Sequence, residues 1–204
     1  MKTLFIEAKL KNLDIQLSKQ EISRLPREIV LAYSIQYKEI AYNIAKQLKH
    51  NNIKLNKITQ VLGCSKLKTH LPILLVGTGR FHATNLYLQS PIIYVLEGNK
   101  IIQIPESEIN KLKAKRKTAF IKFLSAESIG ILVSTKPGQE NLNKAIKLKQ
   151  KLIKQGKSTH IFVSNNIDTS QFENFNINSW INTACPGLAN DNSNIINIDD
   201  LPAI

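Results

Sequence analysis

Short runs of apolar, often β-branched residues alternate along the chain with stretches in which apolar residues recur every three or four positions. Residues 28–35 form the first such run and predict a buried strand. An amphipathic helix is predicted next, with apolar positions at Ile40, Ala41, Ile44, Ala45 and Leu48. After a polar break at 50–52, a further apolar segment leads into Cys64. Strand, helix and strand in this order are typical of a parallel sheet.

The same order recurs in the second half of the chain. Residues 129–134 and 160–163 predict strands, and the helix between them ends at Gly156. After a polar stretch, the segment 179–186 predicts another strand that ends at Cys185. The pattern therefore predicts two divergent copies of one unit, each with its cysteine at the end of an equivalent strand. Loops at the carboxyl ends of parallel strands commonly build sites, which favours a joint role for the two cysteines.

The region between the two copies predicts two more strands and a connecting helix. The strands are expected at 73–76 and 92–95, and a basic helix is expected over 108–123. The fold class that follows is α/β, with two consecutive small parallel-sheet α/β domains flanked by helices. We expect the domains to span residues 1–124, with Cys64, and 125–204, with Cys185.

Composition narrows the class of protein without identifying its function. With 43% hydrophobic residues, 204 residues suffice for a sizeable core. No membrane span or signal peptide is evident, which predicts a cytoplasmic protein. The net charge of +13 is compatible with an acidic or nucleic-acid partner. However, the lysines fall mostly at helix-like spacing, and few aromatic residues accompany them. This favours a solvated lysine-rich surface over a surface on which the bases of a single-stranded nucleic acid stack.

Two cysteines in an intracellular chain do not predict a disulfide, because cytosolic thiols are kept reduced. From the residues alone they are inert core residues, metal ligands or nucleophiles. The spacing of these two residues does not decide among the three roles.

Two loops are candidates for ligand binding. Residues 77–82 (Gly-Thr-Gly-Arg-Phe-His) follow a strand, and Gly77 and Gly79 could let a ligand approach the backbone, although a tight turn with Arg80 on its rim and a structural His82 explains them equally well. Residues 134–139 precede a helix, where free amides favour an anionic group such as a carboxylate. Neither loop has the spacing of a dinucleotide fingerprint or a P-loop.

Taken together, four segments resemble the diphthamide biosynthesis family, 2-(3-amino-3-carboxypropyl)histidine synthase. In chain order they are residues 60–64 (Gln-Val-Leu-Gly-Cys), 77–82, 135–139 (Thr-Lys-Pro-Gly-Gln) and 182–186 (Asn-Thr-Ala-Cys-Pro) with Asp191. The resemblance covers nearly the whole chain, and the four linked motifs make it specific although each is weak alone.

The resemblance implies repeated α/β domains that each donate one cysteine to a single 4Fe-4S cluster. In the family, the reduced cluster cleaves S-adenosyl-L-methionine, and the resulting 3-amino-3-carboxypropyl radical adds to a histidine of translation elongation factor 2. Soft thiolates suit such a cluster. By this resemblance Cys64 and Cys185 are cluster ligands. The positions expected to bind S-adenosyl-L-methionine are Gly77, Gly79, Arg80, His82, Ser134, Thr135, Lys136, Gly138, Gln139 and Asp191.

The sequence departs from the family pattern in two places. Family members begin with an additional α/β domain that carries the first cysteine, and this chain begins at what resembles the second domain. A second departure is Gly187-Leu188 in place of the family's Arg-Ile, which removes a bidentate donor.

We therefore expect a separate chain, as from a split gene, to bring the missing domain and the third cysteine. The other expected partners are elongation factor 2 as protein substrate and an electron donor, and the assembled enzyme could dimerise. Three alternatives stay open: a degenerate relative, a non-catalytic accessory subunit of the same pathway, and a basic nucleic-acid-binding α/β module.

Overall fold

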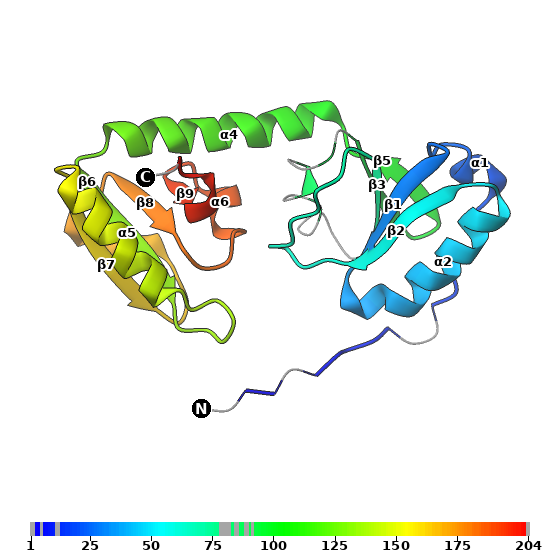
Figure 1. The fold of residues 1–204 in the computed structure, drawn as a ribbon, viewed down its shortest axis with the longest axis horizontal. Coiled ribbons are helices and arrows are strands. Elements are labelled where there is room, and N and C mark those ends of the chain that lie inside the picture. Colours follow the sequence, from blue (N-terminus) through cyan, green and yellow to red (C-terminus); the bar gives the residue numbers. More distant parts are fainter. Residues whose placement is uncertain are drawn as a thin grey trace. The chain divides into compact units, whose positions relative to one another are not determined.

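The computed structural model describes residues 3–4, 6–10, 13–77, 83, 86–87, 90 and 92–202, without the side chain of Asp191. These residues divide into two compact units, Met1–Ile109 and Asn110–Ile204. Each unit is built around one β-sheet (Figure 1). None of the helices in the described part of the chain is long and apolar enough to cross a membrane.

The sheet of the first unit has five strands in the order β2-β1-β3-β4-β5. Strands β1 to β4 run parallel, and β5 pairs with β4 in the antiparallel sense. The bounds are β1 (Glu28–Tyr33), β2 (Lys54–Gln60), β3 (Ile73–Val76), β4 (Ile93–Glu97) and β5 (Lys100–Gln103), with α1 (Lys19–Ile22), the 3-10 turn η1 (Ile35–Tyr37) and α2 (Lys38–His50) as the helical elements.

Helix α2 covers one face of this sheet. Its apolar positions, including Ile44 and Leu48, are fully buried against side chains such as Leu31 and Leu74. Residues that alternate to the opposite face, such as Val30 and Leu75, are buried as well. Burial on both faces explains why these strands read as continuous apolar runs rather than as alternating ones.

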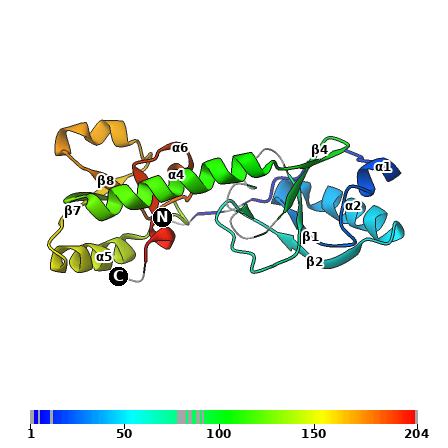
Figure 2. The ribbon, with the colours of Figure 1, turned by 90° about the horizontal axis from the view of Figure 1, so that it is seen from above.

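The second unit contains four parallel strands in the order β7-β6-β8-β9. Their bounds are β6 (Ser128–Ser134), β7 (Ser158–Ser164), β8 (Ser179–Asn182) and β9 (Ile195–Asn197). The helical elements of this half of the chain are α4 (Glu106–Ser125), α5 (Leu142–Lys154), η2 (Thr169–Phe175), α6 (Leu188–Asp191) and η3 (Ile198–Asp200), and Figure 2 shows the helices from above.

Two different cores lie on the two faces of this second sheet. On one face, side chains of α4 and α5, such as Phe123 and Leu152, pack with Ile131 and Ile181. On the other, Trp180 packs against Phe162 and Phe172, with ring centroids 4.9 and 5.8 Å away. Gly130 makes room for the indole, because a Cβ there would lie 2.3 Å from two of its ring carbons.

The two units share one strand order, which confirms that the chain repeats a single α/β unit. In each, the first strand is central, the second lies on one side, and the third and fourth lie on the other. The expectation that the cysteines end equivalent strands is wrong, however. Cys64 follows β2, the second strand of its unit, whereas Cys185 follows β8, the third strand of its own. Both nevertheless lie in loops at the carboxyl end of a parallel strand.

Most elements expected from the periodicity are present, and the fold is α/β with two largely parallel sheets as predicted. The sequence pattern places a domain boundary at 124/125, whereas the compact units divide at 109/110. The difference lies in α4, because Ala119 and Phe123 near its end belong to the core of the second unit. Strands β5 and β9 were not predicted.

Candidate functional site

The loop that carries Cys185 is fixed by two buried asparagines. The Asn182 amide donates to the carbonyl of Cys185 (2.8 Å) and to Oδ1 of Asn197 (2.8 Å), and its own Oδ1 accepts from the Ala184 N–H (2.9 Å). Asn197 in turn donates to the Pro186 carbonyl at 3.2 Å. These bonds satisfy the polar groups of an otherwise irregular loop, so the Cys185 backbone has a defined position.

Neighbouring residues attach the same loop to the central strand β6. Both the N–H and the hydroxyl of Thr183 donate to the Leu132 carbonyl, at 3.1 and 2.8 Å. On the other side, the Asn141 amide donates to the Thr183 carbonyl at 2.7 Å. Asn141 precedes α5 and follows the predicted ligand loop 134–139, so this bond joins that loop to the cysteine loop.

The 134–139 loop is built around a tight turn. The Gln139 N–H donates to the Lys136 carbonyl at 3.0 Å, with Pro137 and Gly138 between them. Gly138 has φ +78°, the left-handed conformation that the third position of a type II turn requires. At the start of the loop, the buried Ser134 hydroxyl accepts from the Lys136 N–H at 3.1 Å. The loop lies at the carboxyl end of β6 and is joined through Asn141 to the Cys185 loop.

Cys64 lies on a short turn just beyond β2. The Ser65 hydroxyl accepts from the Leu62 N–H at 2.8 Å, and the Ser65 N–H donates to the Leu62 carbonyl at 3.0 Å. The turn is attached to the sheet by a bond from the Val61 N–H to the Tyr33 carbonyl at 2.8 Å. Its cysteine is exposed, so the thiol is accessible to a ligand or a reagent.

Gly77 follows β3 at the same sheet edge. A Cβ at Gly77 would lie 3.0 Å from the hydroxyl oxygen of the buried Ser34, so the glycine lets two neighbouring strand ends approach closely. Of the other predicted positions, Gly79, Arg80 and His82 lie outside the described residues. Asp191 is the last residue of α6, which begins directly after the Cys185 turn.

The thiols fit an iron–sulfur cluster in kind. Both are free, with Cys185 partly buried and Cys64 exposed, and thiolates are the usual ligands of such clusters. They do not fit it in number. Within the described residues no three His, Cys, Asp or Glu side chains gather in a way that could hold a metal ion. The sequence contains two cysteines, one fewer than a cluster held by three thiolates requires.

The phenol of Tyr33, at the carboxyl end of strand β1, has a raised pKa. Burial raises the pKa of the Tyr33 phenol, and the neighbouring Tyr42 phenol raises it further. The two rings have centroids 6.1 Å apart. Tyr33 is thus a neutral residue at the end of β1, between the turn of Cys64 and Gly77.

Comparison with known proteins assigns the family. A family model described as "Putative diphthamide synthesis protein" matches residues 1–195. The chain belongs to this family. A 2-(3-amino-3-carboxypropyl)histidine synthase of Pyrococcus horikoshii is 24% identical over 185 residues, which are 84% of this chain and 54% of that protein. Subunit 1 of the corresponding Yarrowia lipolytica enzyme is 27% identical over 141 residues, 65% of this chain and 32% of that one.

Solved structures resemble the chain at the level of the fold. Dph2 from Pyrococcus horikoshii, crystallised also with a 4Fe-4S cluster, matches with a TM-score of 0.76 and 22% identity. The match covers 89% of this chain and 58% of that one. The diphthamide-family chain described here thus spans about half the length of its Pyrococcus relative.

Sequence reasoning found both cysteine loops but missed the residues that hold the second one. Asn182 and Asn197 are 2% and 5% exposed, and Asn141 bridges two loops. The available signal was a pair of asparagines at the ends of two apolar runs, since an asparagine directly after a buried strand often satisfies loop backbone.

Proposed function

We propose that this chain takes part in the first step of diphthamide synthesis by contributing Cys64 and Cys185 as thiolate ligands of a 4Fe-4S cluster. The reaction is the transfer of a 3-amino-3-carboxypropyl group from S-adenosyl-L-methionine to a histidine of translation elongation factor 2. The observation that carries the proposal is that both free thiols of this family member lie in loops at the carboxyl ends of parallel strands.

The third thiolate comes from outside these 204 residues, which contain two cysteines. We propose that a separate chain with an α/β domain of its own supplies it, and that the assembled complex is the active transferase. The bound cluster would supply the electron and an open iron site for S-adenosyl-L-methionine. An electron donor is then a further partner.

The residues of this chain have two tasks in the proposed enzyme. The hydrogen bonds of Asn182 fix the backbone of the Cys185 loop. The loop then needs little rearrangement when the Cys185 thiolate binds the cluster. The 134–139 loop carries the exposed Lys136, whose ammonium is a suitable partner for the carboxylate of the methionine moiety. The segment from Gly77 to His82 and Asp191 complete the proposed pocket.

The test is anaerobic reconstitution with ferrous iron and sulfide, with the chain alone and co-expressed with its partner. The complex should contain one 4Fe-4S cluster, measured by iron and sulfide content and by visible absorption. Cys64→Ser and Cys185→Ser should each lower the iron content, because each removes a ligand. Lys68→Ala, an exposed position near Cys64, is the matched control and should leave the iron content unchanged.

Full iron content in both serine variants would rule out the ligand assignment. Transfer of radiolabel from the aminocarboxypropyl group to elongation factor 2 measures the activity itself. If the complex transfers the group while both serine variants remain fully active, the chain is an accessory subunit rather than a ligand donor.

A further inference from the structure

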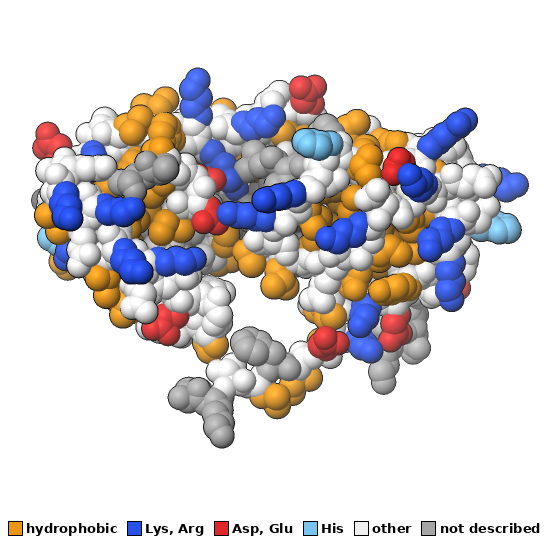
Figure 3. Space-filling view, in the orientation of Figure 1, with side chains coloured by type: hydrophobic (Ala, Val, Ile, Leu, Met, Phe, Trp, Pro, Cys, Tyr) orange, Lys and Arg blue, Asp and Glu red, His pale blue; other side chains and the backbone are white. Residues whose placement is uncertain are grey.

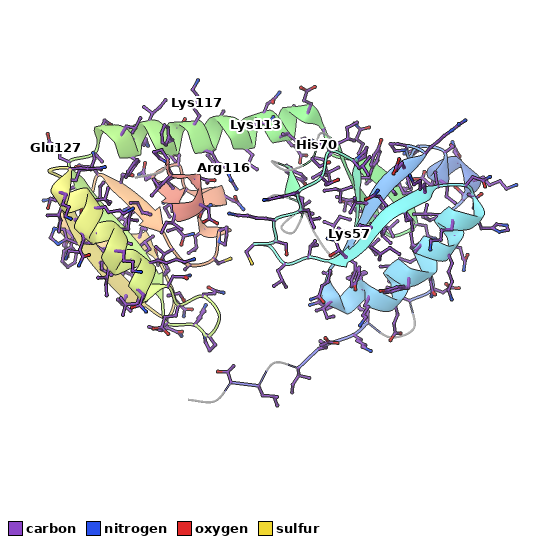
Figure 4. The ribbon with its side chains drawn as sticks, viewed as in Figure 1. Lys57, His70, Lys113, Arg116, Lys117 and Glu127 are labelled. Atoms are coloured by element: carbon purple, nitrogen blue, oxygen red, sulfur yellow. The ribbon has the colours of Figure 1, made fainter. Side chains whose placement is uncertain are left out.

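The segment that follows Cys64 exposes every second side chain. The side chains at 64, 66, 68 and 70 are exposed, whereas those at 65, 67 and 69 are partly buried. The exposed positions after the cysteine are Lys66, Lys68 and His70, and we call these three residues the basic strip. Figure 4 labels His70 on the segment between β2 and β3. An alternation of two is typical of an extended chain with one side against the protein, so the strip lies on the solvent side.

Hydrogen bonds at both ends give this segment a defined conformation. At its start, the Ser65 hydroxyl accepts from the Leu62 N–H at 2.8 Å. At its end, the Thr69 hydroxyl accepts from the Leu71 N–H at 3.0 Å, and the Ser90 hydroxyl donates to the Leu71 carbonyl at 2.9 Å. The inward-facing residues thus hold the chain while the outward-facing ones are available to a partner.

The basic strip is close to the thiol along the chain. A chain extends by at most about 3.6 Å per residue, so the Cα atoms of Lys66 and Lys68 lie within about 7 and 14 Å of the Cα atom of Cys64. A partner that contacts both lysines is therefore adjacent to whatever the thiolate binds.

The sequence around Cys64 carries charge of one sign. No aspartate or glutamate occurs between Glu39 and Glu97, whereas six lysines and Arg80 lie in that interval. The whole chain contains 15 acidic residues, so their absence from this stretch is a local feature. A surface with clustered positive charge attracts and orients a partner whose own surface is acidic.

An apolar side chain lies beside the thiol as well. Leu62, two residues before Cys64, is 54% exposed. An apolar contact with charged residues around it is typical of the interfaces between proteins that associate transiently. Residues 61–72 contain no aromatic side chain on which a nucleic-acid base could stack. These features favour an acidic protein over a single-stranded nucleic acid as the partner.

We propose that the basic strip, together with Leu62, docks an acidic electron-transfer protein that reduces the cluster bound through Cys64. This inference rests on the proposed function, which assigns Cys64 as a cluster ligand. The donor loses one electron, which passes to the cluster, and no bond forms or breaks and no proton moves. The strip follows a thiolate ligand, whereas S-adenosyl-L-methionine binds the iron that has no thiolate, so the donor and the substrate approach different sides.

The experiment is stopped-flow reduction of the reconstituted complex by a reduced plant-type ferredoxin, a small acidic protein that serves as the probe. At about 0.1 M salt, the double change Lys66→Glu, Lys68→Glu should lower the second-order rate constant at least about 10-fold, because complementary charge raises association rates by about 10 to 10³. At about 1 M salt the rate constants of the variant and the unaltered complex should converge, since charges are then screened within about 3 Å.

The matched control is Lys147→Glu, Lys154→Glu, which changes two exposed lysines of α5 and alters the net charge equally. Its rate constant should stay within about twofold of the unaltered value at about 0.1 M salt, where charges more than about 10 Å from the contact are screened. Dithionite should reduce all three complexes to the same extent. Equal slowing in both double variants would assign the effect to net charge, and slowing that persists at high salt would assign it to the cluster potential. Either result would overturn the proposal.

Binding of the donor is measured separately because it does not require iron. Labelled oxidised ferredoxin should bind the unaltered complex more tightly than the strip variant in fluorescence anisotropy. Carbodiimide should join its carboxylates to Lys66 or Lys68, and cross-links confined to other lysines would contradict the docking site. Loss of single-stranded RNA binding in the strip variant, with ferredoxin binding unchanged, would assign the strip to nucleic acid instead.

The two proposals fail in different ways. Strip-dependent ferredoxin binding by a complex that lacks iron would contradict the cluster assignment alone. Full iron content together with reduction that does not depend on the strip would contradict the docking inference alone.

Discussion

At the scale of single residues, the Asn182 side chain forms three hydrogen bonds at the candidate site. Its side chain satisfies the Cys185 carbonyl, the Ala184 N–H and the Asn197 side chain at once. We predict that Asn182→Ala lowers the free energy of unfolding by about 2–3 kcal/mol, because it leaves buried polar groups without partners. Urea unfolding measures the loss, and Asn143→Ala on the exposed side of α5 is the control.

The same variant should loosen the cysteine loop. In a Cys64→Ser background, the remaining Cys185 thiol should react faster with a thiol reagent after Asn182→Ala than before it. An unchanged reaction rate together with unchanged stability would mean that the asparagine does not hold the loop.

Buried tyrosines make the first unit sensitive to high pH. Burial raises the pKa of Tyr94, so the folded state keeps the phenol proton at a pH where the unfolded chain, with a pKa of about 10, begins to lose it. The stability contributed by this proton is thus complete below about pH 10 and falls as the pH rises through the folded pKa. Unfolding in urea at about pH 8 and about pH 10.5 should show a smaller loss in Tyr94→Phe than in the unaltered protein.

A comparison variant separates this effect from the titration of the many lysines. Tyr37→Phe replaces a tyrosine outside the buried core set, and its loss between the two pH values should match that of the unaltered protein. Equal losses in all three proteins would contradict the assignment to Tyr94.

At the scale of elements, local periodicity predicted β1, α2, β6, α5 and β7 because these elements are long and strongly patterned. It missed β5, where Gly98 with φ +59° turns the chain back into an antiparallel strand, and the three-residue β9. The cysteine loops could be predicted from motifs. Their unequal places in the repeat could not, because lateral strand order and the Asn182–Asn197 pair depend on contacts between residues distant in sequence.

Helix α4 shows how one element can join two units while packing mainly in one. Arg116 forms a 3.0 Å salt bridge with Asp200, and the Lys115 ammonium donates to the Asn190 carbonyl at 2.6 Å, both within the second unit. Figure 4 labels Arg116 on the side of α4 that meets these elements and Lys117 on the other side. The exposed Lys113 and Lys117 leave the outer side of the helix to solvent.

We predict that Phe123→Ala destabilises the second unit selectively. The ring is 3% exposed, lies in the core under β6 and has the Lys157 ammonium 5.7 Å from its centroid, so its loss should cost about 3–5 kcal/mol. Hydrogen exchange should speed up in β6 to β9 and stay unchanged in β1 to β4. The control is Leu124→Ala, whose side chain is 54% exposed on the same helix. Equal acceleration in both sheets would mean that the two units unfold together.

At the scale of the whole molecule, the question is whether a net charge of +13 marks a nucleic-acid interface. Lysine and arginine side chains on the face in Figure 3 are interspersed with apolar and neutral ones rather than gathered in one block. Aromatic residues make up 6% of the chain, and the aromatic cluster around Trp180 packs in a core. Such a surface attracts polyanions through its charge, whereas the Trp180 cluster, which is packed in a core, is not available for base stacking.

We therefore predict weak, sequence-independent binding of single-stranded RNA, with a Kd of about 10⁻⁴ to 10⁻⁶ M at physiological salt. Fluorescence anisotropy over a salt series should show this affinity falling steeply as salt rises, because released counterions dominate it. Cys64→Ser and Cys185→Ser should bind RNA as the unaltered chain does. Nanomolar, sequence-selective binding that salt barely weakens would instead favour a nucleic-acid-binding module, since base contacts would then supply most of the free energy.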